Sequence, residues 1–353
     1  MSHSLTRRRF LRTGAGLAAA GALSPLLSSC KRSAGQTAAP PEAPPSPEPP
    51  PEAAAASVEG TSRVVVAHDA SVVTPDLVVD RARLETLVDQ ALMAFSGEKS
   101  ADKAWSSLFS TDECVGIKPN GIAGALLSTS TDLIEVCIDR LLGIGLKAEN
   151  IVVWEQDDGR VVNCGLTPTS SASEVRKVGL NGYFSDPVEQ GSFRGRISRL
   201  VTDEIDAILN LPIMKDHAMA GITLAMKNHY GTCDNPGSMH GNACDPYCAD
   251  LNAVPAIRKK TRLIITDATR ALYEGGPSAE MQFVVPYGRV LVARDPVAHD
   301  HIGWGMIDDL RVQNGWPKVA LVGREPVYIR SAAQRGLGID DPSRIEVVEK
   351  SVS

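Results

Sequence analysis

Short apolar runs rich in β-branched residues recur along the chain and predict buried strands. Each run is only three or four residues long, which suits a strand better than a helix. The runs span residues 64–66, 115–117, 151–154, 207–209, 263–265, 290–292 and 345–348. Continuous apolar runs of this kind are typical of strands that are covered on both faces of a sheet.

Apolar residues at helical spacing lie between several of these runs. Residues 76–95 and 133–142 show this pattern, and Thr131 and Asp132 stand where a helix cap is expected. Asp295 followed by Pro296 predicts another helix start. Strands that alternate with helices imply an α/β fold, with a mainly parallel central sheet and helices on both faces. We expect residues 61–353 to form one large domain or two intimately joined lobes.

Residues 1–29 have the pattern of an export signal rather than of a folded element. The segment Thr6-Arg7-Arg8-Arg9-Phe10-Leu11-Arg12 matches a twin-arginine signal, and the apolar run 14–27 is too short for a stable membrane span. Leu27-Ser28-Ser29-Cys30 has the form of a lipobox, which predicts acylation of Cys30. The protein is thus expected to use the twin-arginine export machinery and to be held by lipid at the periplasmic side of the cell envelope. The alternative is a signal peptide with an incidental cysteine.

The composition changes to alanine, proline, glutamate and serine between residues 30 and 60, which predicts an extended tether. Removing residues 1–29 takes away four arginines and no acidic residue, so the net charge falls from −6 to about −10. A chain this acidic, without a nucleic-acid-binding motif, is not expected to bind nucleic acid.

Polar residues follow several predicted strands directly, at the place where open α/β sheets bind ligands. Lys118 and Asn120 end one strand and precede a run of small and hydroxyl residues, which indicates an anion site. An ordinary capped turn is the alternative. Asp157, in an acidic cluster after the next strand, and Asp267, after a later one, could line the same cleft or serve turns alone.

The stretch 210–248 holds three of the seven histidines and three of the seven cysteines. Lys215 and His217 precede a short segment, 221–226, that reads as a helix, and Lys227, Asn228 and His229 follow it. Lysines and histidines that converge near a strand end can bind a carboxylate or phosphate and move protons. Structural histidines remain the alternative.

Four side chains in this stretch have the chemistry of metal ligands: Cys233, His240, Cys244 and Cys248. Zinc and iron–sulfur clusters use such donors, although the spacing matches neither a zinc knuckle nor a ferredoxin run. An exported protein with six cysteines beyond Cys30 could instead form disulfides in this loop. Free thiols are the third possibility.

The order of these motifs resembles the bacterial and archaeal family named domain of unknown function 362. The resemblance covers most of residues 61–310 and rests on Lys118-Pro119-Asn120, Leu211-Pro212, Lys215, His217, Gly221, Thr223, Lys227-Asn228, Gly231, Ile265, Asp267-Ala268, Glu274-Gly275 and Asp295-Pro296-Val297-Ala298. It implies an α/β domain. Some members carry an added ferredoxin-like module, whose four-cysteine run this sequence lacks.

Three functions are compatible with these features. The first is a metal-dependent enzyme for a small anionic substrate, in which Lys215, His217, Lys227 and His229 act in catalysis and Lys118, Asn120, Asp157, Asn228 and Asp267 bind substrate. The second is a ligand-binding lipoprotein with disulfides and no catalysis. The third is an iron–sulfur redox protein.

Overall fold

The structure, a computed structural model, describes residues 59–171 and 173–353. The predicted signal peptide, the lipidation site Cys30 and nearly all of the predicted tether lie outside the described residues. Within the described ranges, no helix has the length and apolar character needed to cross a membrane.

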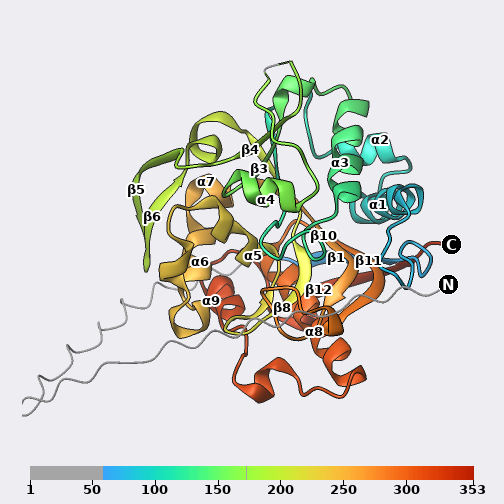
Figure 1. Ribbon diagram of the computed structural model, residues 1–353, viewed down its shortest axis with the longest axis vertical. Helices are drawn as coiled ribbons and strands as arrows, with labels where there is room; N and C mark the ends of the chain where they lie inside the picture. Colours follow the sequence, from blue (N-terminus) through green and yellow to red (C-terminus); the bar gives the residue numbers. More distant parts are fainter. Residues whose placement is uncertain (1–58, 172) are drawn as a thin grey trace, which may run out of the picture. The chain divides into compact units, whose positions relative to one another are not determined.

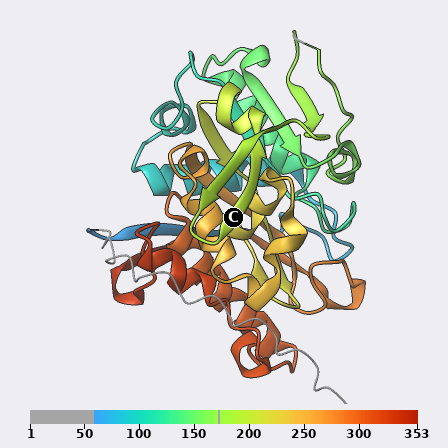
Figure 2. The same ribbon diagram turned by 90° about the vertical axis from the view of Figure 1, so that its left-hand side faces the viewer.

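The described chain folds around a large mixed, mainly parallel sheet of ten strands (Figure 1). Its strands are β1 (Ser62–His68), β2 (Val115–Lys118), β3 (Ile151–Glu155), β4 (Arg176–Gly179), β7 (Ala207–Asn210), β8 (Ile213–His217), β9 (Gly221–Thr223), β10 (Thr261–Leu272), β11 (Val284–Ala293) and β12 (Ile345–Ser351). A separate antiparallel pair consists of β5 (Phe184–Gln190) and β6 (Phe193–Ser198), which faces the viewer in Figure 2.

The main path of the sheet runs β12-β1-β11-β10-β7-β2-β3-β4, and β8 pairs with β10 and β9. Only β11, against its two neighbours, and β9, against β8, pair in the antiparallel sense. Because β2, β3 and β7 are parallel neighbours, their carboxyl ends lie side by side at one end of the strands. Their last residues are Lys118, Glu155 and Asn210. The candidate site lies at this end.

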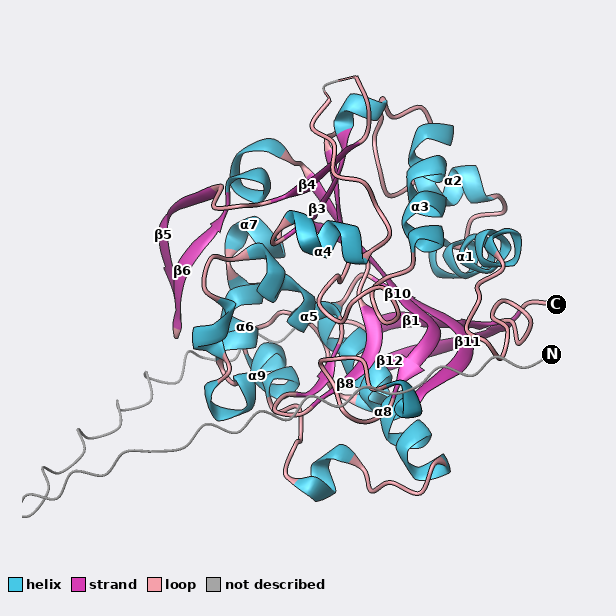
Figure 3. Cartoon of the chain, in the orientation of Figure 1, coloured by secondary structure: helices cyan, strands magenta, loops and turns pink. Residues whose placement is uncertain are grey.

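Helices cover both faces of the sheet (Figure 3). The helices are α1 (Arg81–Ser96), α2 (Ala101–Ser106), α3 (Thr131–Gly143), α4 (Asp158–Asn163), α5 (Ala225–Asn228), α6 (Tyr247–Ala253), α7 (Pro255–Arg258), α8 (Pro296–Gln313) and α9 (Tyr328–Gln334). Helices α1 to α4 share one apolar core with the sheet, and α5 to α9 share the other. Side chains alternate across β1 accordingly: Val65 enters the first core and Val66 the second.

The α/β architecture and all seven predicted strands are confirmed. The helix predicted from residue 76 begins only at Arg81, because Asp80 caps it and Leu77 has a left-handed backbone (φ 65°) that a helix excludes. The helix predicted over 221–226 is wrong. Gly221 to Thr223 instead form β9 on the edge of β8, and a four-residue helix follows.

Candidate functional site

A cleft of about 250 Å³ opens at the carboxyl ends of the parallel strands. Strands β2, β3, β8 and β9, the helix α5 and the loop that follows it supply most of its walls. The polar side chains that line it are Lys118, Asn120, Glu155, Arg160, His217, Thr223, Lys227, Asn228, Tyr230 and His240. Of the four residues predicted to act in catalysis, His217 and Lys227 line the cleft, whereas Lys215 and His229 do not.

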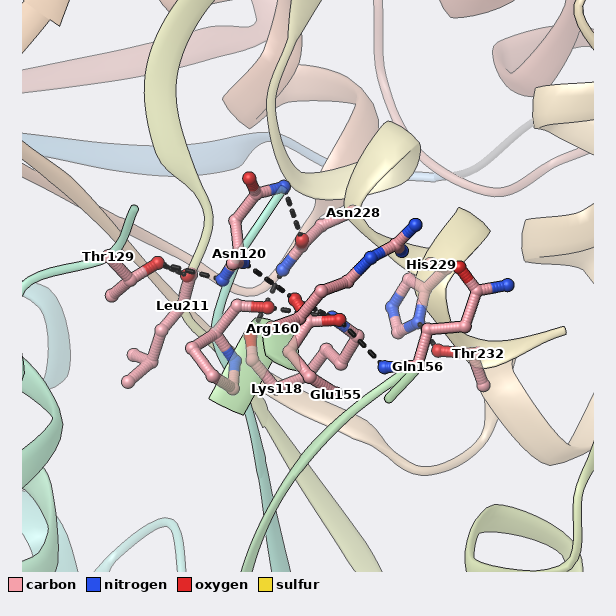
Figure 4. A network of polar contacts seen from close by, with 12 residues as sticks. Lys118, Asn120, Thr129, Glu155, Gln156, Arg160, Leu211, Asn228, His229 and Thr232 are labelled. Carbon is pink, nitrogen blue, oxygen red and sulfur yellow. Dashed lines mark hydrogen bonds and ion pairs between the residues drawn. The ribbon is translucent and has the colours of Figure 1, made fainter. Parts of the chain in front are cut away.

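A buried ion pair joins the ends of β2 and β3 (Figure 4), and both of its residues line the cleft. The Lys118 Nζ lies 2.9 Å from Glu155 Oε1, and both side chains are almost fully buried. Glu155 also accepts the backbone N–H groups of Gly121 and Gln156 at 2.8 and 2.9 Å. Because these contacts occupy both carboxylate oxygens, the pair is a neutral scaffold rather than a free acid or base.

A chain of amide side chains continues from this pair (Figure 4). Asn228 Nδ2 donates to the Lys118 carbonyl at 3.0 Å and to Asn210 Oδ1 at 2.7 Å, and its Oδ1 accepts from Asn120 Nδ2 at 2.9 Å. Lys215, fully buried behind the cleft wall, donates to Asn120 Oδ1 at 2.9 Å. Burial lowers the pKa of Lys215 to about 7, so this amine titrates near neutral pH.

Lys227 lines the cleft next to His240 and Tyr230. Its Nζ lies 3.1 Å from His240 Nε2 and 3.5 Å from the centre of the Tyr230 ring. Burial lowers the pKa of Lys227, while the neighbouring Cys244 and Cys248 act in the opposite direction. Within the described residues, Lys227 thus contacts a neutral imidazole, an aromatic face and the Cys244 side chain, and no ion pair joins it to a carboxylate.

The hydrogen bonds of the two cleft histidines fix their tautomers. His240 Nδ1 lies 2.9 Å from the Pro236 carbonyl, which can only accept, so Nδ1 carries the proton and Nε2 accepts from Lys227. His217 Nδ1 accepts the backbone N–H groups of Met219 and Ala220, both at 3.1 Å, so its proton is on Nε2. Burial, with the charge of Lys227, lowers the pKa of His217 to about 3, which keeps its imidazole neutral.

The hydroxyl of Thr223 is a buried polar group without a partner among the described residues. Thr223 ends β9, is 4 % exposed and is one of the residues that line the cleft. Buried polar atoms of folded proteins are nearly always hydrogen-bonded, so an orphaned hydroxyl in a cleft indicates a position that a ligand completes.

Asp300, a residue of α8, positions the helix that carries Lys227. Its carboxylate accepts the backbone N–H groups of Ala225 and Met226 at 2.8 and 3.1 Å, and His299 Nδ1 lies 2.8 Å from it. A four-residue helix cannot be stable by itself, because it leaves most of its end groups unpaired. The carboxylate of a distant helix therefore replaces the missing cap.

Several of the predicted site residues lie outside the cleft: Lys215 and the three cysteines, and also Asp157, Asp267 and His229. Asp157 caps α4 by accepting the Arg160 N–H at 2.9 Å, and Asp267 accepts Ser130 N at 2.8 Å and the Thr269 hydroxyl at 2.6 Å. His229 is buried, with its Nε2 3.5 Å from Asn210 Nδ2, and is not among the residues that line the cleft. Burial lowers the pKa of His229 to about 3, in keeping with a neutral structural histidine.

The cysteines predicted as metal ligands are all buried free thiols: Cys233, Cys244 and Cys248. No disulfide joins any of the six cysteines within the described ranges. Burial raises the pKa of Cys233 to about 12, so its thiol is protonated at neutral pH. Across residues 59–171 and 173–353, no group of three or more His, Cys, Asp or Glu side chains is placed to hold a metal ion. His240 contacts Lys227 instead, so the metal centre stays a prediction that these contacts do not support.

Sequence reasoning missed several contributors, among them Glu155, Thr223, Tyr230 and Asp300. An unpaired hydroxyl has no sequence signal, so only the family resemblance points to Thr223. Tyr230 follows Lys227 by three residues, a spacing that could have placed the two side chains on one helical face. Asp300 acts across 75 residues of sequence, and its neighbours gave no sign of this contact.

Residues 115–305 match the family described as Domain of unknown function (DUF362). The chain belongs to this family. The match includes all the residues that line the cleft, from Lys118 to Pro277. No curated protein matches the chain.

Among solved structures, the chain is similar to the crystal structure of a structural-genomics target from Thermotoga maritima. The TM-score is 0.40 at 10% sequence identity, over 66% of this chain. The chain spans 59% of the length of that protein.

Proposed function

We propose that this DUF362 protein is an acid–base enzyme for a small anionic substrate, which it binds in the cleft around Lys227. The observation that carries the proposal is the contact of Lys227 with the neutral His240 at 3.1 Å. A buried amine beside a neutral imidazole joins two groups that can carry a proton, as general acid–base catalysis requires.

The charge balance of the cleft favours an anion. Glu155 neutralises Lys118, and Arg160 contacts the Asp157 carboxylate at 3.3 Å. Lys227 contributes a positive charge that no carboxylate balances within the described residues, and Lys215 lies behind the wall. An anionic group of the ligand would supply the missing negative charge in a site of low polarity, where charges interact strongly.

Hydrogen-bond donors complete the proposed binding site. His217 Nε2 carries a proton and Thr223 offers its unpartnered hydroxyl, and both side chains line the cleft. Together with Lys227 they could hold two oxygens of a carboxylate or phosphate. The cleft volume of about 250 Å³ lies just below the roughly 300–1,000 Å³ of most ligand pockets, which favours a small substrate.

The residues divide the proton transfer between them. Protonated Lys227 donates toward His240 Nε2, and the Pro236 carbonyl holds the Nδ1–H of that ring in place. Once a proton moves from Lys227 to His240 or to substrate, the neutral amine is a base inside the cleft. The lowered pKa of Lys227, caused by burial, favours this neutral form more than an exposed lysine would.

Solvent isotope exchange tests this proposal. The full chain is incubated in D₂O with small carboxylic, hydroxy and keto acids, and deuterium incorporation at carbon is followed by NMR. We expect exchange in at least one acid, and we expect Lys227→Met and His240→Gln to lose it. Lys147→Met, a change at an exposed lysine of a surface turn, is the matched control. Binding without exchange in any acid would favour the non-catalytic binding protein.

The metal-dependent form of this function finds no support in the donor set. Lys227 occupies His240 Nε2 and the Pro236 carbonyl occupies Nδ1, so neither ring nitrogen of this histidine is free for a cation. We therefore assign the proton transfer to Lys227 and His240 alone. Metal analysis of protein purified without chelators or oxygen tests this choice: a stoichiometric metal lost on His240→Gln would overturn it.

We also propose that the protein is exported by the twin-arginine machinery and anchored by lipid at Cys30. The twin-arginine pattern at Arg7 and Arg8 and the lipobox before Cys30 support this location. Mass spectrometry of the membrane fraction tests it, because an acylated amino-terminal Cys30 is expected there. Its absence, or unchanged membrane retention in Cys30→Ser, would contradict the anchor.

A further inference from the structure

A second cavity, of about 580 Å³, lies at the amino ends of the parallel strands, opposite the cleft. Ser62 and Thr261, the first residues of the parallel strands β1 and β10, line it together with Arg294, which follows the end of the antiparallel β11. The cleft, in contrast, lies where parallel strands end. The two cavities therefore belong to different sites, and ligand binding in the second does not depend on the proposed enzyme activity of the first.

Basic side chains dominate the charged lining of this cavity. Arg63, Arg258, Lys259 and Arg294 line it, against the single acid Asp295. Arg63 pairs with Glu346 at 2.9 Å, and Arg258 donates to the Gly336 carbonyl at 2.6 Å. Across the described residues, no ion pair engages Lys259 or Arg294, and both side chains are exposed. The cavity thus has an excess of positive charge.

The acid of the cavity is already committed to the fold. Asp295 Oδ1 accepts Val297 N and Ala298 N at 2.8 and 3.0 Å, so it caps α8. Its Oδ2 accepts Ile339 N at 2.9 Å and the Ser62 hydroxyl. Asp295 therefore pins three segments at the cavity wall and has no further oxygen with which to pair Lys259 or Arg294.

Apolar side chains stand beside the basic ones. Phe95, Ile257 and Leu337 line the same cavity, which lets it take a ligand with an apolar part. Arginine recognises phosphate through two parallel hydrogen bonds, and lysine supplies a point charge. Three arginines and a lysine around one cavity therefore suit a phosphate better than a neutral ligand.

We propose that this cavity binds an organophosphate: a phosphate group held by Lys259, Arg258 and Arg294, with an apolar body against Phe95 and Leu337. The phosphate can come from a soluble phosphate ester or from the headgroup of an anionic phospholipid. Thr61 and Ser62 line the cavity, so the segment that leads back toward Cys30 joins the domain at this site.

The test uses the full chain with Cys30→Ser, so that an acyl anchor cannot drive binding. The soluble probes are inorganic phosphate and glycerol 3-phosphate, measured by calorimetry. The membrane probes are vesicles of phosphatidylglycerol and of phosphatidylcholine, measured by flotation. We expect saturable binding of glycerol 3-phosphate or of phosphatidylglycerol vesicles, weakened by added salt because the cations are exposed. The probe that binds identifies the source of the phosphate.

Lys259→Gln combined with Arg294→Gln should weaken this binding roughly tenfold or more, as expected for the loss of two charged contacts. The matched control removes the same charge at exposed sites elsewhere, through Lys103→Gln combined with Arg194→Gln. Equal melting temperatures show that all variants fold, and single variants replace a double variant that does not. In the Lys227→Met background, the same two substitutions should cause the same fold-loss of binding, which separates this site from the cleft. An equal loss in the control, or no preference for any phosphate probe over chloride, would overturn the proposal.

Discussion

Lys227 and His240 form a direct contact, in which the amine of one lies 3.1 Å from the Nε2 of the other. The Pro236 carbonyl fixes the proton of His240 on Nδ1, so Nε2 must accept. This contact gives the histidine of the loop 233–248 a role other than metal binding, because its Nε2 accepts a hydrogen bond from Lys227. It also places a titratable amine next to a neutral base in a small cleft, which is the basis of the proposed function.

Thr223→Val should separate stability from binding. The Thr223 hydroxyl is buried and unpartnered within the described residues, so a methyl group of the same shape removes an uncompensated polar atom. We expect the free energy of unfolding to rise by about 1 kcal/mol, while affinity for the anionic ligand falls. Chemical denaturation and calorimetry measure the two quantities.

Thr269→Val is the matched control for Thr223→Val. The Thr269 hydroxyl donates to Asp267 at 2.6 Å, so its loss leaves a buried carboxylate short of a partner and should destabilise the protein. Ligand affinity should stay unchanged there. Equal destabilisation by Thr223→Val and Thr269→Val would show that the Thr223 hydroxyl has a structural partner. It would contradict the assignment of this hydroxyl to ligand binding.

Glu155→Gln should lower the free energy of unfolding more than most single substitutions at the carboxyl ends of the strands. It leaves the buried Lys118 ammonium without its counter-charge, a loss of about 3–5 kcal/mol for buried pairs. Glu346→Gln breaks the exposed pair with Arg63 and should cost about 1 kcal/mol or less. Urea denaturation at neutral pH compares the two variants. Similar small losses would mean that Lys118 and Glu155 are not a buried pair in solution.

Ligand binding should weaken as the pH rises through about 7. Burial lowers the pKa of Lys215 to about 7, so its ammonium is charged below this pH and neutral above it. A positive charge behind the cleft favours an anion, and its loss should lower affinity several-fold, which is up to about 1 kcal/mol. Calorimetric titrations across this range measure the effect. Lys215→Met should lose the step near pH 7; an unchanged step would assign it to another group.

His229 should make the protein less stable in mild acid. Its folded-state pKa is lowered to about 3 by burial, whereas the unfolded imidazole has its ordinary value of about 6.5. Below about pH 6.5 the unfolded chain therefore binds a proton that the folded chain does not. The free energy of unfolding therefore decreases as the pH is lowered. From pH 7 to pH 5 the loss should be about 2 kcal/mol for this residue.

His229→Gln should flatten that dependence, although it lowers stability at neutral pH. Denaturation curves at several pH values give the slope for parent and variant. Equal slopes would show that the imidazole of His229 is free to take a proton in the folded protein.

The sequence anticipated the sheet and much of the cleft for a physical reason. Continuous apolar runs such as 115–117 and 151–154 are stable only as strands that are covered on both faces. Parallel neighbouring strands also bring their carboxyl ends together. Lys118 and Lys215 could therefore be expected near each other. In the structure, both lie around Asn120, which contacts Lys215 directly.

The remaining features depended on contacts between distant residues. His217 and His229 looked equivalent in sequence, yet β8 places the first in the cleft and a buried turn places the second behind it. Asp157 and Asp267 have the same carboxylate chemistry as Glu155, but local turns and caps take up their oxygens. Only the three-dimensional partner of each group separates a structural role from a candidate functional one.

Calorimetric titration of the full chain with acetate, pyruvate and lactate tests the central claim most directly, with parent, Lys227→Met, Lys227→Arg and Lys147→Met compared side by side. The account predicts that at least one of these anions binds the parent and the Lys147→Met control alike. It predicts that binding falls roughly tenfold or more in Lys227→Met and is partly restored in Lys227→Arg. Binding that survives Lys227→Met unchanged would contradict the claim that Lys227 is the centre of an anion site.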